Sequence, residues 1–508
     1  MLIRWAAIFC LLCLLHLFRD NVEGNELHKF IEAVATRNPN WLPGAYAEKP
    51  DSSLRHLIFY ASFVPLLERD HFLAASIVGR VAAYALLAGG LAYVTRRMGL
   101  ATGWALGVVY AMYVIRSMAA GEWIIGGVEP KVFAYGIVFF VMGLLTLEHL
   151  PWLRIAMLLA AATLVHVLVG LYATFSSLAV WLAMVWQRTG TARRIPWNVI
   201  LVGGFVGLAF VGPAFEHFSS DWDREDARIY VTLRSPHHLD PSHWPLAAWL
   251  RLAGFSALFA LAWLIAARRS PTAASAHRLG VFCAASFIPL VIGLLASPFP
   301  IRWYVLPYYP FRFADVMIPF GVLMLGALAL QHSISPRWSK AAQVGIVAAL
   351  SILVVPFCRD ALALRRFPVD PYSGVTEDWY ACMKWIRSNT PPDALFVVPP
   401  IASESFPWLA RRRALAVFKH TSLSGGLKEW ERRMSDLAGW QGPWPARGWD
   451  AARLIAERYD RRTTPEAEAL MAKYGAGYWI ARAGKQTLDL PAVFSNREFV
   501  VYARRPEK

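Results

Sequence analysis

Three carboxylates lie close together just after the first hydrophobic segment of the chain: Asp20, Glu23 and Glu26. A carboxylate held at a membrane surface can act as a general base or as an oxygen ligand of a cation. Acidic residues in such a position can also form a solvated loop that does no chemistry. The residue types alone are compatible with either interpretation, and all three residues are candidate catalytic groups.

The residues that follow predict a helix that would hold these acids in place. Leu27, Phe30, Ile31 and Val34 recur at the spacing of one apolar helix face. A helix of this kind lies on the membrane with its polar face in water, and Asn25 is suited to cap it. The carboxylates then gather near the N-terminal end of the helix, where the helix dipole favours negative charge.

A second group of charges borders two hydrophobic segments further along the chain. Glu122, Glu129 and Lys131 belong to the stretch Gly121–Lys131. A charge at the membrane boundary is costly unless it is paired or used, so these three residues are candidates for substrate binding. A Glu129–Lys131 pair could instead serve only to anchor the end of a helix. The apolar stretch Trp123–Val128 contains two glycines and can dip back into the protein.

Histidines supply a third kind of candidate. His166 lies in an otherwise apolar run, where it is either a hydrogen-bonding partner between helices or a residue of the site. His237 and His238 are followed by Asp240, and imidazole and carboxylate groups are ligands that some metals accept. No local spacing in this loop enforces a coordination geometry, so we assign no metal ligands and treat both histidines as candidates for substrate binding.

Two arginines, Arg302 and Arg312, lie among aromatic residues at a predicted membrane surface. A guanidinium group in such surroundings can hold a phosphate with two parallel hydrogen bonds, while the aromatic rings line a lipid tail. Ordinary anchoring of a membrane protein by Trp, Tyr and Arg gives the same pattern. The sequence allows both interpretations.

The composition indicates that these residues belong to a multi-spanning membrane protein. Apolar residues make up 56% of the chain, with 22 Trp and 29 Phe. The net charge of +16 would suggest nucleic acid as the partner of a soluble protein. Here much of the basic excess lies in loops beside the membrane and in the C-terminal part, so an anionic lipid or a lipid phosphate is the expected partner and nucleic acid is not.

About eleven apolar segments have roughly the length that a bilayer requires. They lie near residues 3–18, 72–94, 100–119, 132–147, 153–170, 171–186, 197–214, 245–266, 279–297, 313–331 and 341–357. The pair between 153 and 186 could also be one tilted helix with a re-entrant piece. The shorter run His56–Leu67 is expected to lie against the membrane. No small-residue cleavage site follows the first segment, so we expect it to be retained.

Short loops rich in Lys and Arg place the N-terminus in the cytoplasm and the long loops outside. We therefore predict an all-α transmembrane domain over residues 1–357, with a long first outer loop at 19–56. From residue 358 to 508, strand patterns alternate with helical ones, which is typical of a small α/β domain. The expected strands lie at 394–398, 414–418, 477–480 and 499–502, and helices are expected near 427–438, 449–459 and 465–473. This soluble domain is expected on the outer face of the membrane. Five cysteines form no metal-binding pattern.

The order of these parts resembles the C-type (GT-C) glycosyltransferases, which are multi-spanning membrane enzymes that take a sugar from a polyprenyl-phosphate carrier. In the bacterial aminoarabinose and mannosyl transferases of this class, an Asp-Glu pair is followed by a tryptophan-proline segment and a Lys-Pro pair. The matching positions here are Asn25-Glu26, Trp41-Leu42-Pro43 and Glu48-Lys49-Pro50. Because Asn replaces Asp in the first of these motifs, the catalytic acid could be Glu26, Glu23 or Asp20, or be absent.

The whole chain is also similar to a group of bacterial multi-spanning membrane proteins that brings no activity with it. The shared motifs are Glu129-Pro130-Lys131, His237-His238-Leu239-Asp240, Pro310-Phe311-Arg312 and the tail segment 385–394. The tail segment also recurs in many C-type transferases.

The resemblance to the transferases implies a glycosyltransferase at the outer face of the bacterial cytoplasmic membrane. A carboxylate would activate the acceptor, and Arg302, Arg312 and Lys131 would stabilise the phosphate leaving group. Some members of the class use a divalent cation, which is therefore a candidate cofactor. The alternative function is a non-catalytic binder or a transporter of lipid-linked glycans.

Overall fold

The computed structural model describes residues 1–17, 72–187, 195–218, 222–356, 375–401, 403–420 and 426–505, together with residues 25, 26, 30, 33, 65 and 66. The chain divides into two compact units. The first comprises Met1–Arg19, Ile77–Phe215 and His237–Leu364. The second comprises Asp20–Ser76, Glu216–Pro236 and Arg365–Lys508.

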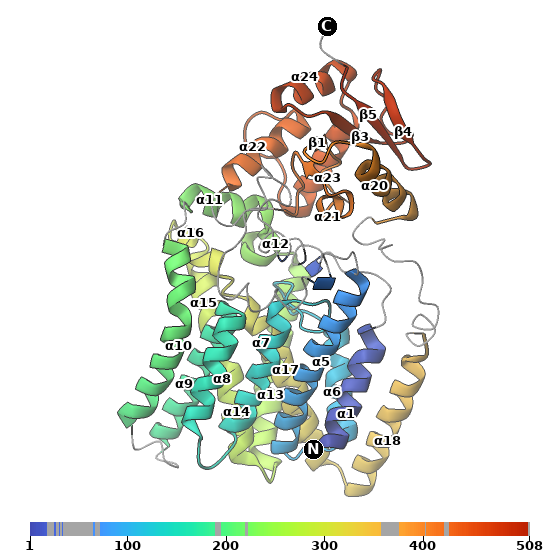
Figure 1. Ribbon diagram of the computed structural model, residues 1–508. Helices are drawn as coiled ribbons and strands as arrows, with labels where there is room; N and C mark the ends of the chain where they lie inside the picture. The colour runs from blue at the N-terminus through green and yellow to red at the C-terminus, as the bar shows by residue number, and fades with distance from the viewer. Residues whose placement is uncertain are drawn as a thin grey trace. The chain divides into compact units, whose positions relative to one another are not determined.

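The first unit is built of apolar helices that run alongside one another (Figure 1). They are α1 (Leu2–Leu12), which continues as the π-helix η1 (Cys13–Leu17), α5 (Phe72–Arg97), α6 (Thr102–Ile115), α7 (Pro130–Leu145), α8 (Trp152–Val165), α9 (Val167–Trp186), α10 (Ile195–Phe218), α13 (Leu246–Arg269), α14 (Ala273–Ala285), α15 (Phe287–Ala296), α17 (Arg312–Ser333) and α18 (Pro336–Leu353). Short helices connect some of them: α12 (Pro236–Leu239), η4 (Pro241–His243), α16 (Arg302–Val305) and η5 (Leu306–Tyr308).

Six helical segments of the described residues are long and apolar enough to cross a membrane. They are Ala74–Arg97, Val167–Trp186, Trp197–Ala214, Leu246–Arg269, Ala273–Ala296 and Arg312–Ser333. Four shorter apolar helices accompany them, at Leu2–Leu17, Thr102–Ile115, Pro130–Leu145 and Trp152–Val165. The prediction of a helical, multi-spanning membrane protein is therefore confirmed.

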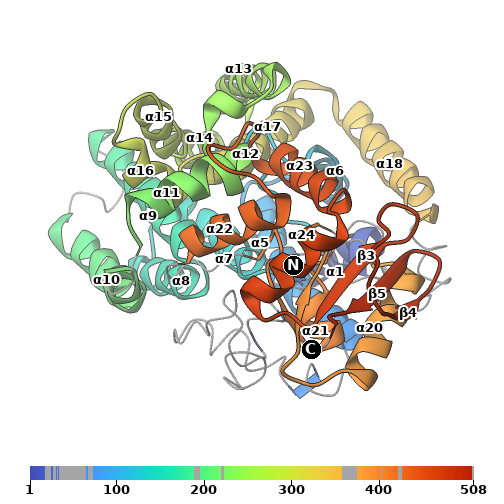
Figure 2. The same ribbon diagram turned by 90° about the horizontal axis from the view of Figure 1, so that it is seen from above.

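Close packing in this unit depends on small residues where helices cross. A side chain added at Gly90 of α5 would lie 2.3 Å from the carbonyl oxygen of Gly136 in α7, so only glycine permits this approach. Only 17% of the apolar segment of α10 and 22% of that of α13 is buried inside the protein. This is expected for helices whose sides face lipid. Seen from above, α10 and α18 lie on opposite sides of the helical unit (Figure 2).

The break between α8 and α9 lies at His166, and not near residue 170 where we placed it from the sequence. His166 has an extended backbone (φ −150°, ψ 102°) and its side chain accepts a hydrogen bond from the backbone N–H of Val169. The imidazole thus serves as the N-cap of α9. A polar residue that appears isolated in an apolar run therefore separates two helices.

The second unit contains a five-stranded mixed sheet with the order β2-β1-β3-β5-β4. The strands are β1 (Leu395–Val397), β2 (Arg413–Ala414), β3 (Tyr478–Arg482), β4 (Ala492–Ser495) and β5 (Phe499–Ala503). Strand β1 pairs in parallel with β2 and β3, whereas β5 pairs in antiparallel fashion with β3 and β4. The predicted small C-terminal sheet is present.

The helices of this unit are α11 (Arg224–Arg228), the π-helix η3 (Ile229–Arg234), α20 (Glu377–Asn389), α21 (Phe406–Ala410), α22 (Leu427–Ala438), α23 (Gly448–Asp460) and α24 (Thr464–Tyr474). Its core is rich in aromatic residues, because Trp379, Trp408, Trp430 and Trp479 are almost completely buried. The strand predicted at 414–418 is shorter than expected. The chain leaves the sheet after Ala414, and the N–H of Phe418 donates instead to the carbonyl oxygen of Pro400 at 2.8 Å.

The segment before α12 belongs to this second unit and is tied to α22 by ion pairs. Lys428 Nζ pairs with the carboxylate of Asp223, and Arg228 Nη2 lies 3.3 Å from Glu431 Oε1. Asp223 also caps α11, whose first turn forms a capping box with Asp226. These contacts hold α11 against α22 within the second unit.

Candidate functional site

The loop between α6 and α7 is wrapped around a single carboxylate, that of Asp315 in the first turn of α17. Asp315 Oδ2 accepts hydrogen bonds from Ser117 Oγ at 2.6 Å and from the backbone N–H groups of Ala120 and Glu122, both at 3.0 Å. Its Oδ1 accepts a further bond from the N–H of Ala119 at 2.6 Å. Asp315 is fully buried, so these four donors satisfy a charge that would otherwise be costly in this position.

One further hydrogen bond holds the same loop inside the protein. The hydroxyl of Tyr84 in α5 donates to the carbonyl oxygen of Gly126 at 2.6 Å, and it also lies 2.9 Å from His16 Nδ1. Ile124, Ile125 and Val128 are buried. The apolar part of the loop therefore dips back into the protein, as the sequence suggested.

His238 packs against the middle of this loop. Its Nδ1 lies 2.5 Å from the carbonyl oxygen of Ala120, which makes Nδ1–H the donor. Gly121 has φ of +74°, and a Cβ at this position would lie 2.9 Å from the imidazole ring. Glycine is therefore required at position 121 both by the backbone conformation and by the approach of His238.

Glu122, in this loop, belongs to a cluster of charged side chains with Glu129, Lys131 and Arg312. Glu122 Oε2 lies 3.5 Å from Lys131 Nζ and 3.4 Å from Arg312 Nε, and Lys131 Nζ lies 3.3 Å from Glu129 Oε2. The side chains of Glu122 and Lys131 are 2% and 6% exposed, whereas that of Arg312 is 24% exposed. Arg312 is thus the cation of this cluster that is most open to an incoming ligand.

Aromatic rings support both cations. The guanidinium carbon of Arg312 lies 3.8 Å from the centroid of the Tyr309 ring, and Lys131 Nζ lies 4.9 Å from that of Trp123. Tyr309 adopts a left-handed backbone conformation (φ 52°), which is unusual for a residue with a side chain. Arg116, at the start of the loop, also has a positive φ of 56°, here combined with ψ of −76°. Backbone strain of this kind is often stored at functional sites.

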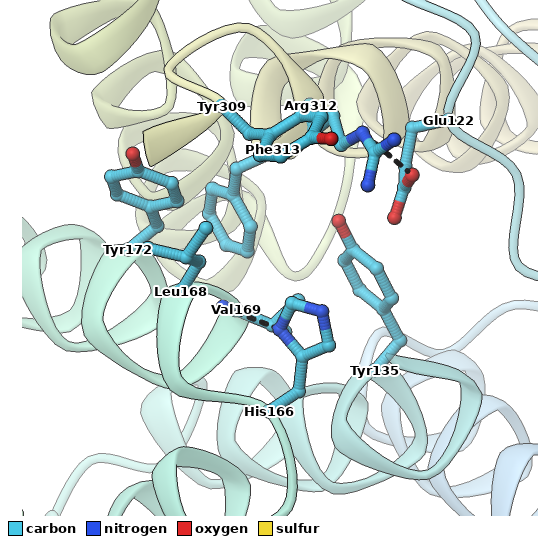
Figure 3. Close-up of a pocket in the computed structure, with 9 residues that line it drawn as sticks. All are labelled: Glu122, Tyr135, His166, Leu168, Val169, Tyr172, Tyr309, Arg312 and Phe313. Atoms are coloured by element: carbon cyan, nitrogen blue, oxygen red, sulfur yellow. Dashed lines mark hydrogen bonds and ion pairs between the residues drawn. The ribbon is translucent and has the colours of Figure 1, made fainter. Parts of the chain in front are cut away.

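A pocket of about 100 Å³ lies beside the charged cluster (Figure 3). It is lined by Glu122, Tyr135, His166, Leu168, Val169, Tyr172, Tyr309, Arg312 and Phe313. Figure 3 shows the hydroxyl of Tyr135 pointing toward the space between Glu122 and Arg312. Tyr135 is completely buried, and among the described residues its hydroxyl has no hydrogen-bond partner. A buried, unpaired hydroxyl that faces a pocket is a group ready to bind a ligand.

Burial shifts the protonation of two groups in this site. It raises the pKa of the Glu122 carboxyl, and the positive charges of Lys131 and Arg312 oppose this effect. Burial also lowers the pKa of His238 well below its usual range, and the charge of Arg312 acts in the same direction. His238 is therefore neutral at pH 7, in agreement with its role as a donor to Ala120.

Several of the residues that the sequence suggested come together here. Glu122, Glu129, Lys131 and Arg312 form the cluster, His166 lines the pocket, and His238 supports the loop. The ring of His237 lies 3.9 Å from that of His238, measured between centroids.

Other candidates lie elsewhere or outside the described residues. Arg302 is not a lining residue of the pocket: its guanidinium stacks on Trp303 and donates to the carbonyl oxygen of Ser297 at 3.4 Å. Glu26 is helical and fully buried, and it accepts a hydrogen bond from Ser76 Oγ at 2.9 Å. Asp20 and Glu23 fall outside the described residues.

Several residues of the site were not identified as candidates from the sequence, among them Asp315, Tyr135 and Tyr309. An acid in the first turn of an apolar helix was the available signal for Asp315, since it is the one carboxylate within Arg312–Ser333. The tyrosines carry no comparable signal, because Tyr is common at membrane boundaries.

Among the described residues, no group of three or more His, Cys, Asp or Glu side chains is placed to hold a metal ion. The polar residues that line the pocket are instead an arginine, three tyrosines, a histidine and a glutamate whose carboxylate is shared between two cations. Guanidinium and phenol are hydrogen-bond donors, and this combination suits an anionic oxygen ligand.

No curated protein matches the sequence. Residues 377–437, which run from α20 to α22, match a family model described as a domain of unknown function, DUF6798.

Solved structures resemble the chain over nearly its whole length. The archaeal oligosaccharyltransferase AglB from Archaeoglobus fulgidus, in complex with an inhibitory peptide and a dolichol-phosphate, matches with a TM-score of 0.53 and 10% identity, over 95% of this chain and 69% of AglB. ArnT from Cupriavidus metallidurans, bound to undecaprenyl phosphate, matches with a TM-score of 0.51 and 13% identity, over 100% of this chain and 99% of ArnT. The apo state of ArnT gives a TM-score of 0.50. At these identities the likeness concerns the fold, and the chain has the fold of the C-type (GT-C) glycosyltransferases.

Proposed function

We propose that this protein is a glycosyltransferase that moves a sugar from a polyprenyl-phosphate donor to an acceptor at the outer face of the bacterial cytoplasmic membrane. The observation that carries the proposal is the pocket in which Arg312 and the unpaired hydroxyl of Tyr135 converge, set in a GT-C fold. The similar structures of ArnT and AglB were solved with undecaprenyl phosphate and dolichol-phosphate, respectively.

The phosphate of the lipid carrier is the part of the substrate that best suits this pocket. A volume of about 100 Å³ is smaller than the cavity of about 150 Å³ that holds benzene in an engineered protein. It therefore accepts a phosphoryl group more readily than a complete sugar. Arg312 offers a fork of N–H donors, and Tyr135 offers an O–H donor. Lys131 adds positive charge nearby.

The chemistry requires a base for the acceptor as well as stabilisation of the leaving phosphate. We assign the base to a carboxylate of the first outer loop, with Glu26 first and Asp20 or Glu23 as alternatives. It takes a proton from the acceptor hydroxyl or amine, which attacks the anomeric carbon while the bond to the phosphate oxygen breaks. Arg312 and Lys131 stabilise the charge that develops on that oxygen. Glu122, Glu129, His166, His237 and His238 shape the surrounding site.

This function also requires a definite topology. We propose about eleven membrane-spanning helices within residues 1–357, an N-terminus in the cytoplasm, and the domain of residues 358–508 on the outer face. A reporter that is active only in the cytoplasm, fused after Lys508, is expected to stay inactive. Activity of this fusion would place every proposed outer loop on the wrong side.

Turnover by the purified protein in lipid nanodiscs is the direct test of the function. With a set of polyprenyl-phosphate sugars and extracts of bacterial envelope as acceptor, we expect sugar to be transferred and polyprenyl phosphate to be released. Tyr135→Phe removes only the hydroxyl and is expected to reduce the rate, whereas Tyr172→Phe serves as the control, because the hydroxyl of Tyr172 already donates to the carbonyl oxygen of Tyr308.

Glu26→Gln is expected to abolish transfer and leave insertion into the membrane intact. Binding of the lipid donor without transfer to any acceptor would favour the alternative, a non-catalytic binder or transporter of lipid-linked glycans.

A further inference from the structure

The two cations of the site share one carboxylate oxygen and hold it loosely. Glu122 Oε2 lies 3.5 Å from Lys131 Nζ and 3.4 Å from Arg312 Nε, and it accepts no hydrogen bond among the described residues. Charge-assisted hydrogen bonds between nitrogen and oxygen are shorter, about 2.7–2.9 Å. A better-placed anionic oxygen could therefore compete with this carboxylate for both cations.

The position of Glu122 in the chain is fixed, although its carboxylate is loosely held. Its backbone N–H donates to Asp315 at 3.0 Å, and the loop on either side of it is anchored by Tyr84 and His238. The side chain is 2% exposed. When Lys131 and Arg312 bind another anion, Glu122 thus remains close to that anion instead of moving into water.

The charges around the pocket are already compensated without a ligand. Among the described residues, Glu122, Glu129 and Asp315 bring three carboxylates to this region, against the two cations Lys131 and Arg312. A phosphate monoester adds a charge of about −1.5 to −2 at pH 7. In a buried site such a surplus of negative charge is costly, because opposite charges and not water must balance it.

We infer that Glu122 is a resident counter-ion, which an incoming phosphate must displace from Arg312 and Lys131 and which thereby weakens phosphate binding. This inference rests on the proposed function, since it concerns the same lipid phosphate. It makes Glu122 a restraint on the affinity of the site and not a ligand of the phosphate.

The restraint acts most strongly on the product. In a polyprenyl-phosphate sugar the phosphate is a diester with one negative charge. Transfer breaks the bond between the sugar and the phosphate oxygen and leaves a monoester, and the proton lost by the acceptor leaves with the base or enters water. The monoester carries the greater charge, so repulsion by Glu122 favours its release. Glu122 therefore helps the site to discriminate between lipid-linked sugar and spent carrier.

Removing the charge of Glu122 tests this inference, because the expected change is a gain in affinity. In nanodiscs of neutral lipid at pH 8, we expect Glu122→Gln to bind undecaprenyl phosphate about tenfold more tightly than the wild type, which corresponds to one unit charge removed at close range. The gain for a singly charged prenyl phosphate diester is expected to be smaller. Glu148→Gln is the matched control: it makes the same charge change at an exposed carboxylate that belongs neither to the charged cluster nor to the lining of the pocket.

The outcomes separate the inference from the proposed function. Equal or weaker binding of the monoester by a folded Glu122→Gln protein would overturn the inference and leave the phosphate site standing. Equal gains in affinity for the monoester and the diester would overturn the claim that Glu122 helps the site to discriminate between the two lipids. If neither the wild type nor any variant binds the lipid phosphate, the proposed function itself fails. Should Glu122→Gln not fold, Glu122→Ala removes the same charge, and the same gain is expected of it.

Discussion

The loop that carries Glu122 is predicted to depend on Asp315 more than on any other side chain. Replacing Asp315 by Asn keeps the size of the side chain but exchanges one carboxylate oxygen for an NH₂ group. The best orientation leaves the amide oxygen at the position of Oδ2, where Ser117 Oγ and the N–H groups of Ala120 and Glu122 donate. The NH₂ group then faces the N–H of Ala119, so this pair of donors repel each other.

The magnitude follows from these four contacts. One buried N–H loses its partner, which costs about 1–3 kcal/mol, and three hydrogen bonds lose the benefit of a charged acceptor, worth up to about 1 kcal/mol each. We expect local opening of the loop to become about 3 kcal/mol easier. Because 1.4 kcal/mol corresponds to a factor of ten, the amide hydrogens of residues 117–122 should exchange roughly a hundredfold faster.

Hydrogen exchange followed by mass spectrometry on the protein in nanodiscs measures this effect locally. Ser117→Ala removes one donor to Asp315 and also the acceptor of the Gly121 N–H, but it leaves the three backbone donors to Asp315 in place, so it should accelerate exchange less than Asp315→Asn does. Asp226→Asn, in the other unit of the chain, should leave residues 117–122 unchanged. Wild-type exchange in Asp315→Asn would refute the view that this carboxylate organises the loop.

Three further predictions concern stability. Arg412→Met removes donors to the carbonyl oxygens of Arg387, Thr390, Ala410 and Arg411 and to Thr390 Oγ1. It should therefore destabilise the second unit by about 3 kcal/mol and lower its Tm. An unchanged Tm would contradict this structural role of Arg412. The hydrogen bond from Lys428 lowers the pKa of Asp223 from 3.8 to about 2. Since the folded-state pKa is depressed, the stabilisation is present above about pH 4 and lost as the pH falls toward 2, and Asp223→Asn should remove this part of the acid dependence of Tm. The pKa of His238 is also depressed, so protonation disfavours the folded loop; corrected for intrinsic rates, exchange at residues 117–122 should rise as the pH falls below about 6.5 in the wild type but not in His238→Asn.

The class of protein and most of its helices could be predicted from the sequence, because long apolar segments and alternating patterns determine them locally. The helices at 427–438, 448–460 and 464–474 were expected almost at these positions. Strand β4 was not expected, since Ala492–Ser495 is short and largely exposed and lacks a strong alternating pattern. The break at His166 was placed too late, because no Gly or Pro marks it in Leu164–Leu168.

The candidate site could be predicted only in part, for a physical reason. Charges beside apolar segments are visible in the sequence, and they pointed to Glu122, Lys131 and Arg312. Which carboxylate faces which cation depends on the packing of α7 against its neighbours and on a loop folded around Asp315, and no local pattern encodes either. Arg302 and Arg312 occupy similar aromatic surroundings in the sequence, yet only Arg312 lines the pocket.

A comparison of the affinities of Arg312→Gln and Arg302→Gln for undecaprenyl phosphate is the decisive test of whether the pocket beside Arg312 binds the lipid phosphate. Both variants lose one positive charge, but only the first loses it from the pocket. We expect Arg312→Gln to weaken binding by at least about tenfold, the value of a charge-assisted hydrogen bond, and Arg302→Gln to bind like the wild type. Equal binding by wild type and Arg312→Gln, or a loss confined to Arg302→Gln, would contradict this expectation.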